Sequence, residues 1–189
     1  MDIVARARGL IMRPREEWQV IAREPTDTAS LFTGYAMPLA LIPAVAGLIG
    51  SMLLSSMLGG LPGMARTGLA AMLLHTVTAY VLGLVAVWVL GKIVQALAPR
   101  FGGVADEVAA MKLAVYSYTA AWLAGIFAII PILAILGLLG LYSLYIFYKG
   151  VPVVARVPED RALGFTLVVI LCAVLVNVLV ITIAGLLLF

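Results

Sequence analysis

The stretch from Leu113 to Tyr148, LAVYSYTAAWLAGIFAIIPILAILGLLGLYSLYIFY, has 36 residues and no charged side chain. As one α-helix it would extend about 54 Å, whereas the hydrocarbon core of a bilayer is about 30 Å thick. Pro131 lies near its middle, and proline disfavours helix at the preceding residue and removes a backbone donor. We therefore predict a helical hairpin that turns at Pro131. One long kinked helix is the alternative, because prolines occur inside spanning helices.

Three further runs without charge surround this hairpin, at 28–65, 67–91 and 162–189. The chain of 189 residues is 65% hydrophobic and 11% charged, whereas soluble domains carry about 25% charged residues. This composition predicts an all-α fold, a polytopic membrane helix bundle with five transmembrane helices. We expect a cytoplasmic amphipathic segment over 1–30 and a five-span domain over 31–189. The expected spans are 31–58, 67–91, 109–130, 132–149 and 162–189.

The distribution of Lys and Arg supports five spans and sets their orientation. With five spans, 11 of the 12 basic residues fall on one side and only Arg66 on the other. Because Lys and Arg stay in the cytoplasm, the N-terminus is expected inside and the C-terminus outside. The first apolar run starts only near Leu31, so we expect no cleaved signal peptide.

The first thirty residues form short amphipathic patterns. Apolar residues recur at helical spacing from Ile3 to Ile11, and Pro14 suits the first turn of a second helix. These helices either lie in the lipid interface or pack on the cytoplasmic ends of the bundle. The candidate lipid-surface contacts are Arg6, Arg8, Arg13 and Trp18, the indole as an interface anchor.

Few polar side chains fall inside the expected spans. His75 is the only histidine of the chain, and Asn177 reaches a comparable depth in the fifth span. The two could form a hydrogen-bonded polar lock between helices, or part of a relay for protons or solutes. A lone histidine without a charged partner favours the lock.

The hairpin brings aromatic side chains of its two arms to similar depths. The candidate lipid or solute cavity in the cytoplasmic half is lined by Tyr116, Tyr118, Trp122 and Tyr145. The alternative is an interfacial belt of aromatic side chains. Alanines at every fourth position, 36–44 and 120–128, allow close helix approach, either within the chain or between copies.

No residue set predicts catalysis, and neither a metal site nor a cofactor is expected. Cys172 is the only cysteine, and His75 has no acidic or second histidine neighbour by spacing. Acidic pairs at 106–107 and 159–160 could bind a divalent cation or a partner, but solvated loop carboxylates that balance local basic residues are the commoner explanation. The chain is therefore expected not to be an enzyme.

Several short segments, in order along nearly the whole chain, carry a family resemblance. They are Pro14 with Trp18, Phe101-Gly102-Gly103, the stretch 116–125 (YSYTAAWLAG), the stretch 140–145 (GLYSLY) leading to Gly150, and the stretch 157–162 (VPEDRA). Together they resemble the bacterial branch of the Yip1 family. The resemblance implies five spans, a cytoplasmic N-terminus, a bacterial inner membrane location and no established reaction.

The favoured function is a non-enzymatic membrane organiser that acts through lipid contact, self-association or recruitment of partners. The alternative is a small channel, transporter or lipid-translocating protein with a polar aromatic cavity in the cytoplasmic half. Expected partners are membrane lipids, a second copy of the chain or another membrane protein. No nucleic acid partner is expected, because no reading motif is present.

Overall fold

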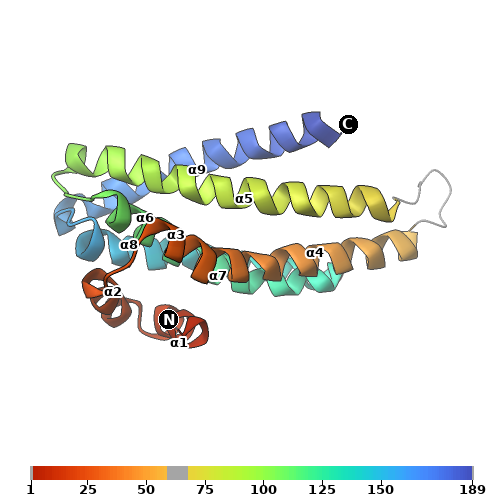
Figure 1. Cartoon of the computed structure of the whole chain (residues 1–189), viewed down its shortest axis with the longest axis horizontal. Helices are drawn as coiled ribbons and strands as arrows, with labels where there is room; N and C mark the ends of the chain where they lie inside the picture. Colours follow the sequence, from red (N-terminus) through yellow and green to blue (C-terminus); the bar gives the residue numbers. More distant parts are fainter. Residues whose placement is uncertain (1, 59–67, 189) are drawn as a thin grey trace.

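The computed structural model describes residues 2–58 and 68–188, with side chains up to Leu179 and that of Thr182. All described elements are helical, and the long ones form one bundle (Figure 1). The first part contains α1 (Ile3–Met12), α2 (Pro14–Arg23), α3 (Thr28–Leu31), η1 (Phe32–Ala36), α4 (Met37–Leu58), α5 (Leu69–Leu97) and η2 (Ala98–Phe101). The second part contains α6 (Glu107–Ser117), α7 (Thr119–Ala124), η3 (Gly125–Ile129), η4 (Pro131–Leu141), α8 (Tyr142–Val154) and α9 (Glu159–Leu188).

Five helical segments of the described chain are long and apolar enough to cross a membrane, which confirms the predicted number. They are Thr28–Leu58, Leu69–Phe101, Glu107–Ile129, Pro131–Val154 and Glu159–Leu179. The second segment continues beyond its predicted end at Gly91, so that Lys92 is carried on the helix. Thr67 and Phe189, two of the predicted span ends, lie outside the described residues.

The chain reverses direction at Pro131, as the sequence predicts. Ile130 leaves the helical conformation, with φ −110° and ψ 113°, because the following proline excludes it from the helix. The two arms then pair, and the Ala121 amide donates a hydrogen bond to Ser143 Oγ at 2.9 Å. The structure therefore has a hairpin here, and the alternative of one kinked helix is wrong.

Much of this hairpin is 3₁₀-helix. The helix η4 has 11 residues, although 3₁₀ runs beyond three or four residues are uncommon. Its sequence repeats every three residues, ILA-ILG-LLG over 132–140, and three residues make one turn of 3₁₀-helix. Ile132, Ile135 and Leu138 consequently share one outward face, with exposed fractions of 82, 67 and 61%.

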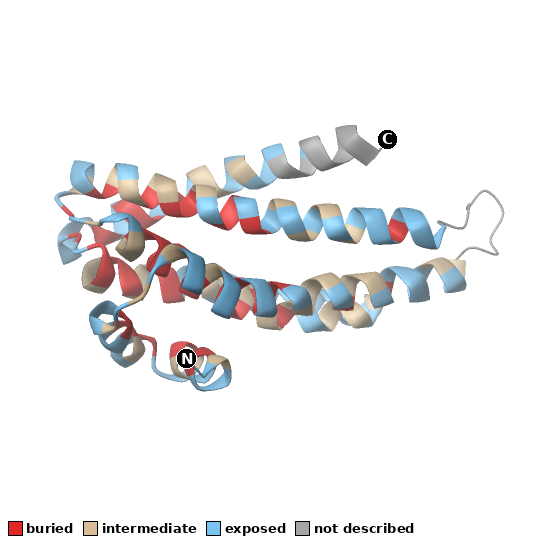
Figure 2. Ribbon diagram, viewed as in Figure 1, coloured by how far each residue is buried: buried red, intermediate tan, exposed pale blue. Residues whose placement is uncertain are grey.

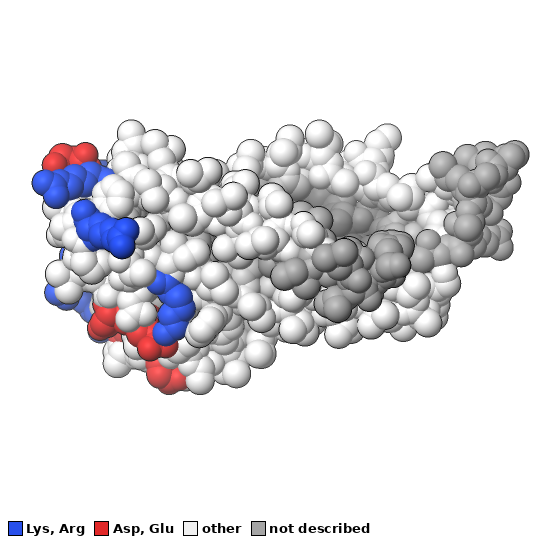
Figure 3. Space-filling model, turned by 90° about the horizontal axis from the view of Figure 1, so that it is seen from above, with Lys and Arg blue, Asp and Glu red and all other residues white. Residues whose placement is uncertain are grey.

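Charged side chains of the described residues gather at one end of the bundle (Figure 3). This charged end carries α1, α2, η2 and the loops at 102–106 and 155–158. The apolar end lies opposite to the charged end. It carries the Pro131 turn, the C-terminal end of α4 and the N-terminal end of α5 (Figure 1). Arg66, the one basic residue predicted for that side, lies outside the described residues.

Buried residues concentrate toward the charged end (Figure 2). We call the part built from α1, α2, η1, α6, α7 and α8 the packed half. Eight of the 11 residues of α6 are buried, because this helix is covered by α5, α8 and the N-terminal segment. We call residues 43–58, 69–83 and 131–141 the open half, where most side chains are exposed or half-buried. In a bilayer, lipid covers such a surface.

Candidate functional site

The helices α1 and α2 dock against the packed half of the bundle. Trp18 is fully buried, and its Nε1 donates a hydrogen bond to the Ile146 carbonyl of α8 at 2.9 Å. The Tyr142 hydroxyl, also on α8, donates to the Ile11 carbonyl at the end of α1 at 3.0 Å. Both helices of the N-terminal segment are thus tied to the same membrane-spanning helix.

Arg6 is the centre of a charged cluster beneath α1. Its guanidinium forms ion pairs with Glu17 and Glu24 and lies over the ring of Tyr116, with 5.7 Å to the ring centroid. Only 7% of the Arg6 side chain is exposed, and its Nε has no hydrogen-bond partner among the described residues. A buried arginine of this kind is stable only while its carboxylate partners stay in place.

Lys112 fastens the other end of α2. Its Nζ donates to the carbonyls of Ile21 (2.8 Å) and Glu24 (2.6 Å), where the last carbonyls of α2 carry partial negative charge. The side chain is buried at the start of the third span. The sequence shows Lys112 directly before the charge-free run that starts at Leu113. The partners of this lysine could not be predicted, because they depend on how α2 docks on the bundle.

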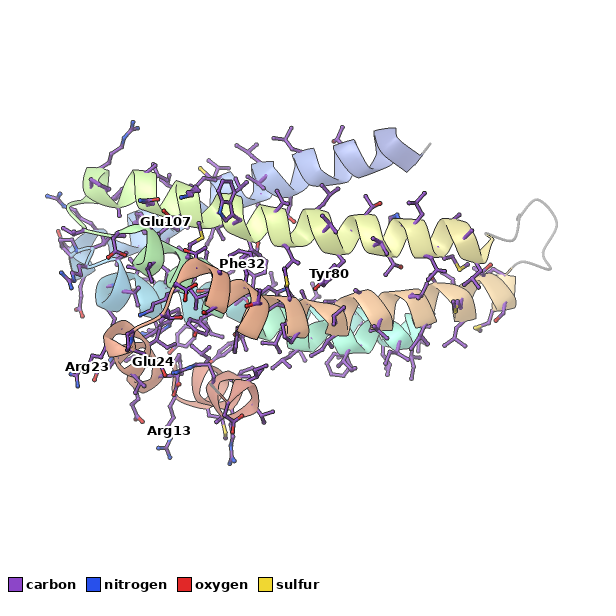
Figure 4. All side chains as sticks on the ribbon, viewed as in Figure 1. Arg13, Arg23, Glu24, Phe32, Tyr80 and Glu107 are labelled. Carbon is purple, nitrogen blue, oxygen red and sulfur yellow. The ribbon has the colours of Figure 1, made fainter. Side chains whose placement is uncertain are left out.

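Burial corrects part of the predicted lipid-contact set. Arg6 and Trp18 face the bundle and cannot contact a lipid surface, because α1 and α2 turn their apolar stripes toward protein. Arg8 and Arg13 point away from the bundle and are exposed; Figure 4 shows Arg13 extending outward from the N-terminal segment. Exposed Val4 and Met12 accompany Arg8 on α1, and Arg13, directly after this helix, forms an exposed ion pair with Glu16 at 3.7 Å.

The predicted aromatic cavity is not formed, because its four residues lie in three environments. Tyr116 is buried in a cluster with the rings of Trp18 (6.3 Å between centroids) and Tyr35 (4.8 Å). The Thr119 hydroxyl donates to the Tyr116 carbonyl at 2.6 Å and lies 2.8 Å from the hydroxyl of Tyr35, which therefore acts as the donor between them. This cluster fills the space in which a cavity was expected.

The other members of the set lie apart from this cluster. Tyr118 packs against Trp122, with ring centroids 5.7 Å apart. Tyr145 is 43% exposed and lies beside Tyr142 and the Lys149 ammonium, 5.3 and 5.2 Å from its ring. The exposed position of Tyr145 corresponds to the alternative interpretation, an interfacial belt.

A groove of about 630 Å³ lies elsewhere, between α4 and α5 in the open half. Trp122 lines its inner end, so one residue of the predicted cavity does face a hollow space. Tyr80 crosses from α5 toward α4 at that end (Figure 4), and its hydroxyl donates to the Met37 carbonyl at 3.2 Å. The groove therefore stops within the bundle and does not continue to the charged end.

The predicted lock between His75 and Asn177 is not formed. His75 lines the groove toward α4, whereas Asn177 lies on α9, and its amide donates to the Ala173 carbonyl of its own helix at 2.9 Å. The Asn177 side chain also interacts with that of Tyr118. The prediction was wrong because α4 and α9 pack on different sides of α5 (Figure 1), and equal depth does not place two side chains on facing surfaces.

The acidic loop residues have structural roles in the described chain. Asp106 caps α6 by accepting a hydrogen bond from the Ala109 amide at 2.7 Å, and Glu107 pairs with Lys92 at 2.9 Å. Glu159 and Asp160 occupy the first turn of α9, where negative charge favours the helix. Within the described residues, no group of three His, Cys, Asp or Glu side chains could hold a metal ion.

The alanine stripes are used for packing inside the chain. Ala36, Ala40, Ala120 and Ala124 are all buried, and α4 packs against both α7 and η3. Close approach continues toward the Pro131 turn, where Gly125 lies against Pro43. The small residues therefore hold the first span against the hairpin.

Comparison with known proteins identifies the family. Residues 8–182 match the Yip1 domain, which covers nearly the whole chain. Neither the curated proteins nor the solved structures gave a significant match. The Yip1 family comprises membrane proteins that are generally non-enzymatic, in agreement with five apolar helices. The chain, a multi-pass membrane protein, belongs to the Yip1 domain family.

Proposed function

We propose that this protein is a non-enzymatic membrane organiser that contacts anionic lipid headgroups through the outer face of α1. The charged end faces the cytoplasm of a bacterium and the C-terminus lies on the other side of its inner membrane, because Lys and Arg stay inside. Lipid contact at this face is the primary activity, and it positions the protein for self-association or for recruitment of another membrane protein.

The position of α1 carries this proposal. Helix α1 packs against α7 and is bonded to Tyr142, both within membrane-spanning segments, so it lies beside the bundle and not beyond its end (Figure 1). At that depth its exposed Val4 and Met12 meet the acyl boundary, while Arg8 reaches the headgroups. Trp18 and Arg6 fix the N-terminal helices on the bundle, so the outer face of α1 is already ordered before lipid binds.

The test measures lipid selectivity of the full chain in vesicles of phosphatidylcholine and phosphatidylglycerol. Spin-labelled lipids report which headgroup occupies the protein boundary. Each arginine near a membrane surface contributes about 1 kcal/mol, so Arg8→Gln with Arg13→Gln should lower the preference for phosphatidylglycerol by about tenfold or more. Val4→Ser with Met12→Ser should loosen α1 from the lipid and reduce the same preference.

Arg100→Gln provides the control, because Arg100 is exposed on η2 and not on α1. The proposal requires that this variant keep most of the selectivity. Equal losses from Arg100 and from the α1 pair would show a general charge effect and contradict the proposal. An unchanged preference in the α1 variants would do the same.

The described residues give less support to the alternative function, transport through a polar aromatic cavity. Tyr116 is packed among protein side chains and Tyr145 lies at the surface. The groove that exists instead is closed toward the charged end by the Tyr80 contact to Met37. A continuous path across the bundle therefore has no support in the described chain.

A further inference from the structure

We propose that the groove between α4 and α5 binds one acyl chain of a membrane phospholipid, with the polar ester region of that lipid near His75, Thr76 and Ser55. This site lies in the open half, away from α1, and it does not depend on the headgroup contact proposed above. Four observations lead to it.

The first observation is the shape of the groove. It extends along α4 from Ala40 to Leu58, which is about 27 Å at 1.5 Å per residue. A volume of about 630 Å³ spread over that length makes the groove elongated and narrow. This elongated shape suits one extended hydrocarbon chain.

The second observation is the lining at the inner end of the groove. The lining residues here are small and apolar. They are Ala40, Ala44 and Gly47 of α4 and Ala79 and Gly83 of α5. A Cβ added at Gly47 or Gly83 would have no described atom within 4 Å. The space above both glycines therefore holds no described protein atom, and in a bilayer it must be filled because close packing leaves no lasting void.

The third observation is a set of unused hydrogen-bond donors toward the apolar end. In the described chain, the side chains of His75, Thr76 and Ser55 have no hydrogen-bond partner. Some hydroxyls elsewhere, those of Thr33 and Thr166, bond instead to a carbonyl four residues earlier in their own helix, at 2.9 and 2.8 Å. Unsatisfied polar groups in lipid are costly, so a ligand with acceptor oxygens is expected here.

The fourth observation is the order of these features along the groove. The polar donors lie in the part of the groove nearer the apolar end, and the apolar floor ends at Trp122 and Tyr80 in the middle of the bundle. A phospholipid has the same order, since ester and phosphate oxygens lie at the membrane surface and the chain lies inside. Ligand sites commonly have volumes of about 300–1,000 Å³, with few polar groups in a mostly apolar lining.

The experiment tests whether larger side chains in the groove prevent lipid from binding. The full chain is purified from membranes, and retained lipid is identified by native mass spectrometry for the wild type and for Gly47→Leu with Gly83→Leu. One phospholipid per chain is expected for the wild type, and the double variant should retain about tenfold less, equivalent to about 1.4 kcal/mol. Gly137→Leu is the matched control, because Gly137 also has open space around it but lies on η4, outside the groove.

A second measurement does not depend on the variants folding. Wild-type protein in phosphatidylethanolamine and phosphatidylglycerol vesicles is labelled with a phospholipid that carries a photoreactive diazirine in its chain. Adducts should concentrate on groove residues of α4 and α5 over the exposed face of η4. Adducts spread evenly over all lipid-facing helices, a retained free fatty acid in place of phospholipid, or a crosslinked dimer through the groove would each overturn the proposal.

Discussion

The helices of the open half are more apolar than those of the packed half, yet Gly47 and Gly83 in the open half have fewer protein neighbours than Gly150 in the packed half. A Cβ at Gly150, in the packed half, would lie 2.5 Å from Trp18 Cε2 and 2.6 Å from Leu113 Cδ1. A Cβ at Gly47 or Gly83, in the open half, would meet no described atom within 4 Å. Residues of the open half that face the hairpin are tightly packed too, since a Cβ at Gly50 would meet the Ala128 carbonyl, so the difference concerns the surface around Gly47 and Gly83.

Polar contacts account for this difference. In the packed half, Trp18, Lys112 and Tyr142 each donate a hydrogen bond to a carbonyl of a distant helix. The ion pairs of Arg6 add a further contact between α1 and α2. In a membrane there is little hydrophobic drive between helices, so such contacts and close packing decide which surfaces meet. The open half has the Tyr80 bond to Met37 at its border and leaves its remaining surface to lipid.

The largest effect that we expect from one substitution is that of Trp18→Ala. It removes a fully buried ring and its hydrogen bond to Ile146, which should lower the free energy of unfolding by about 3–5 kcal/mol. Unfolding in detergent micelles measures this loss. Trp88→Ala is the control, because Trp88 is 44% exposed on α5, and a similar loss there would erase the distinction between a docked and a lipid-facing indole.

Arg6→Met should have the next largest effect. It leaves Glu17 without its cation and uncovers the ring of Tyr116, with a loss of about 3 kcal/mol, less than for a fully buried pair because Glu24 is partly exposed. The same unfolding assay applies. Arg8→Met, on the exposed side of the same helix, should change stability little.

A double variant tests whether the cost arises from an unpaired carboxylate. Adding Glu17→Gln to Arg6→Met should restore part of the lost stability, since the buried charge is then removed together with its partner. Additive losses from the two substitutions would instead show that the ion pair contributes little beyond packing.

The glycine comparison gives a smaller effect of opposite sign in the two halves. Gly150→Ala should destabilise the protein by about 1–3 kcal/mol through overpacking against the Trp18 ring. Gly47→Ala should be neutral or stabilising by up to about 1 kcal/mol, because alanine is the better helix former and no described atom opposes it. Destabilisation by both substitutions would mean that the open half is packed in the membrane.

The smallest effect concerns the pH dependence of the cap before the first span. The Asp27 carboxylate accepts hydrogen bonds from the Ser30 hydroxyl and amide, which lower its pKa below the ordinary value. A lowered pKa in the folded state gives a contribution that is complete above the unfolded pKa of about 3.9 and is lost as pH falls through the folded pKa. Protection of the α3 amides, taken relative to the intrinsic exchange rate at each pH, should therefore fall in acid, and Asp27→Asn, which caps without titrating, should remove this fall.

The span count and the hairpin could be predicted because they follow from runs of uncharged residues and from one proline. The three-residue repeat over 132–140 also carried the signal for a 3₁₀-helix, since its period differs from 3.6. The surroundings of Trp18 and Arg6 could not be predicted, because an amphipathic helix has the same pattern whether its apolar stripe meets lipid or protein.

The groove and the missing His75 lock have a common explanation. Depth along a helix can be counted from sequence, but rotation about its axis depends on which neighbours pack against it. His75 and Asn177 were placed at similar depths, and the structure directs His75 to α4 and Asn177 to its own helix and Tyr118. Rotation likewise decides that Gly47 and Gly83 line one groove.

The hydrogen bond from Trp18 to Ile146 joins residues separated by 128 positions in the chain. During synthesis the indole therefore emerges long before the carbonyl that receives it, and the first two helices must wait at the membrane surface until the fourth span has been inserted. The amphipathic character of α1 and α2 suits that interval, because they can rest on lipid before they meet protein. The N-terminal helices are therefore synthesised first but dock on the bundle last.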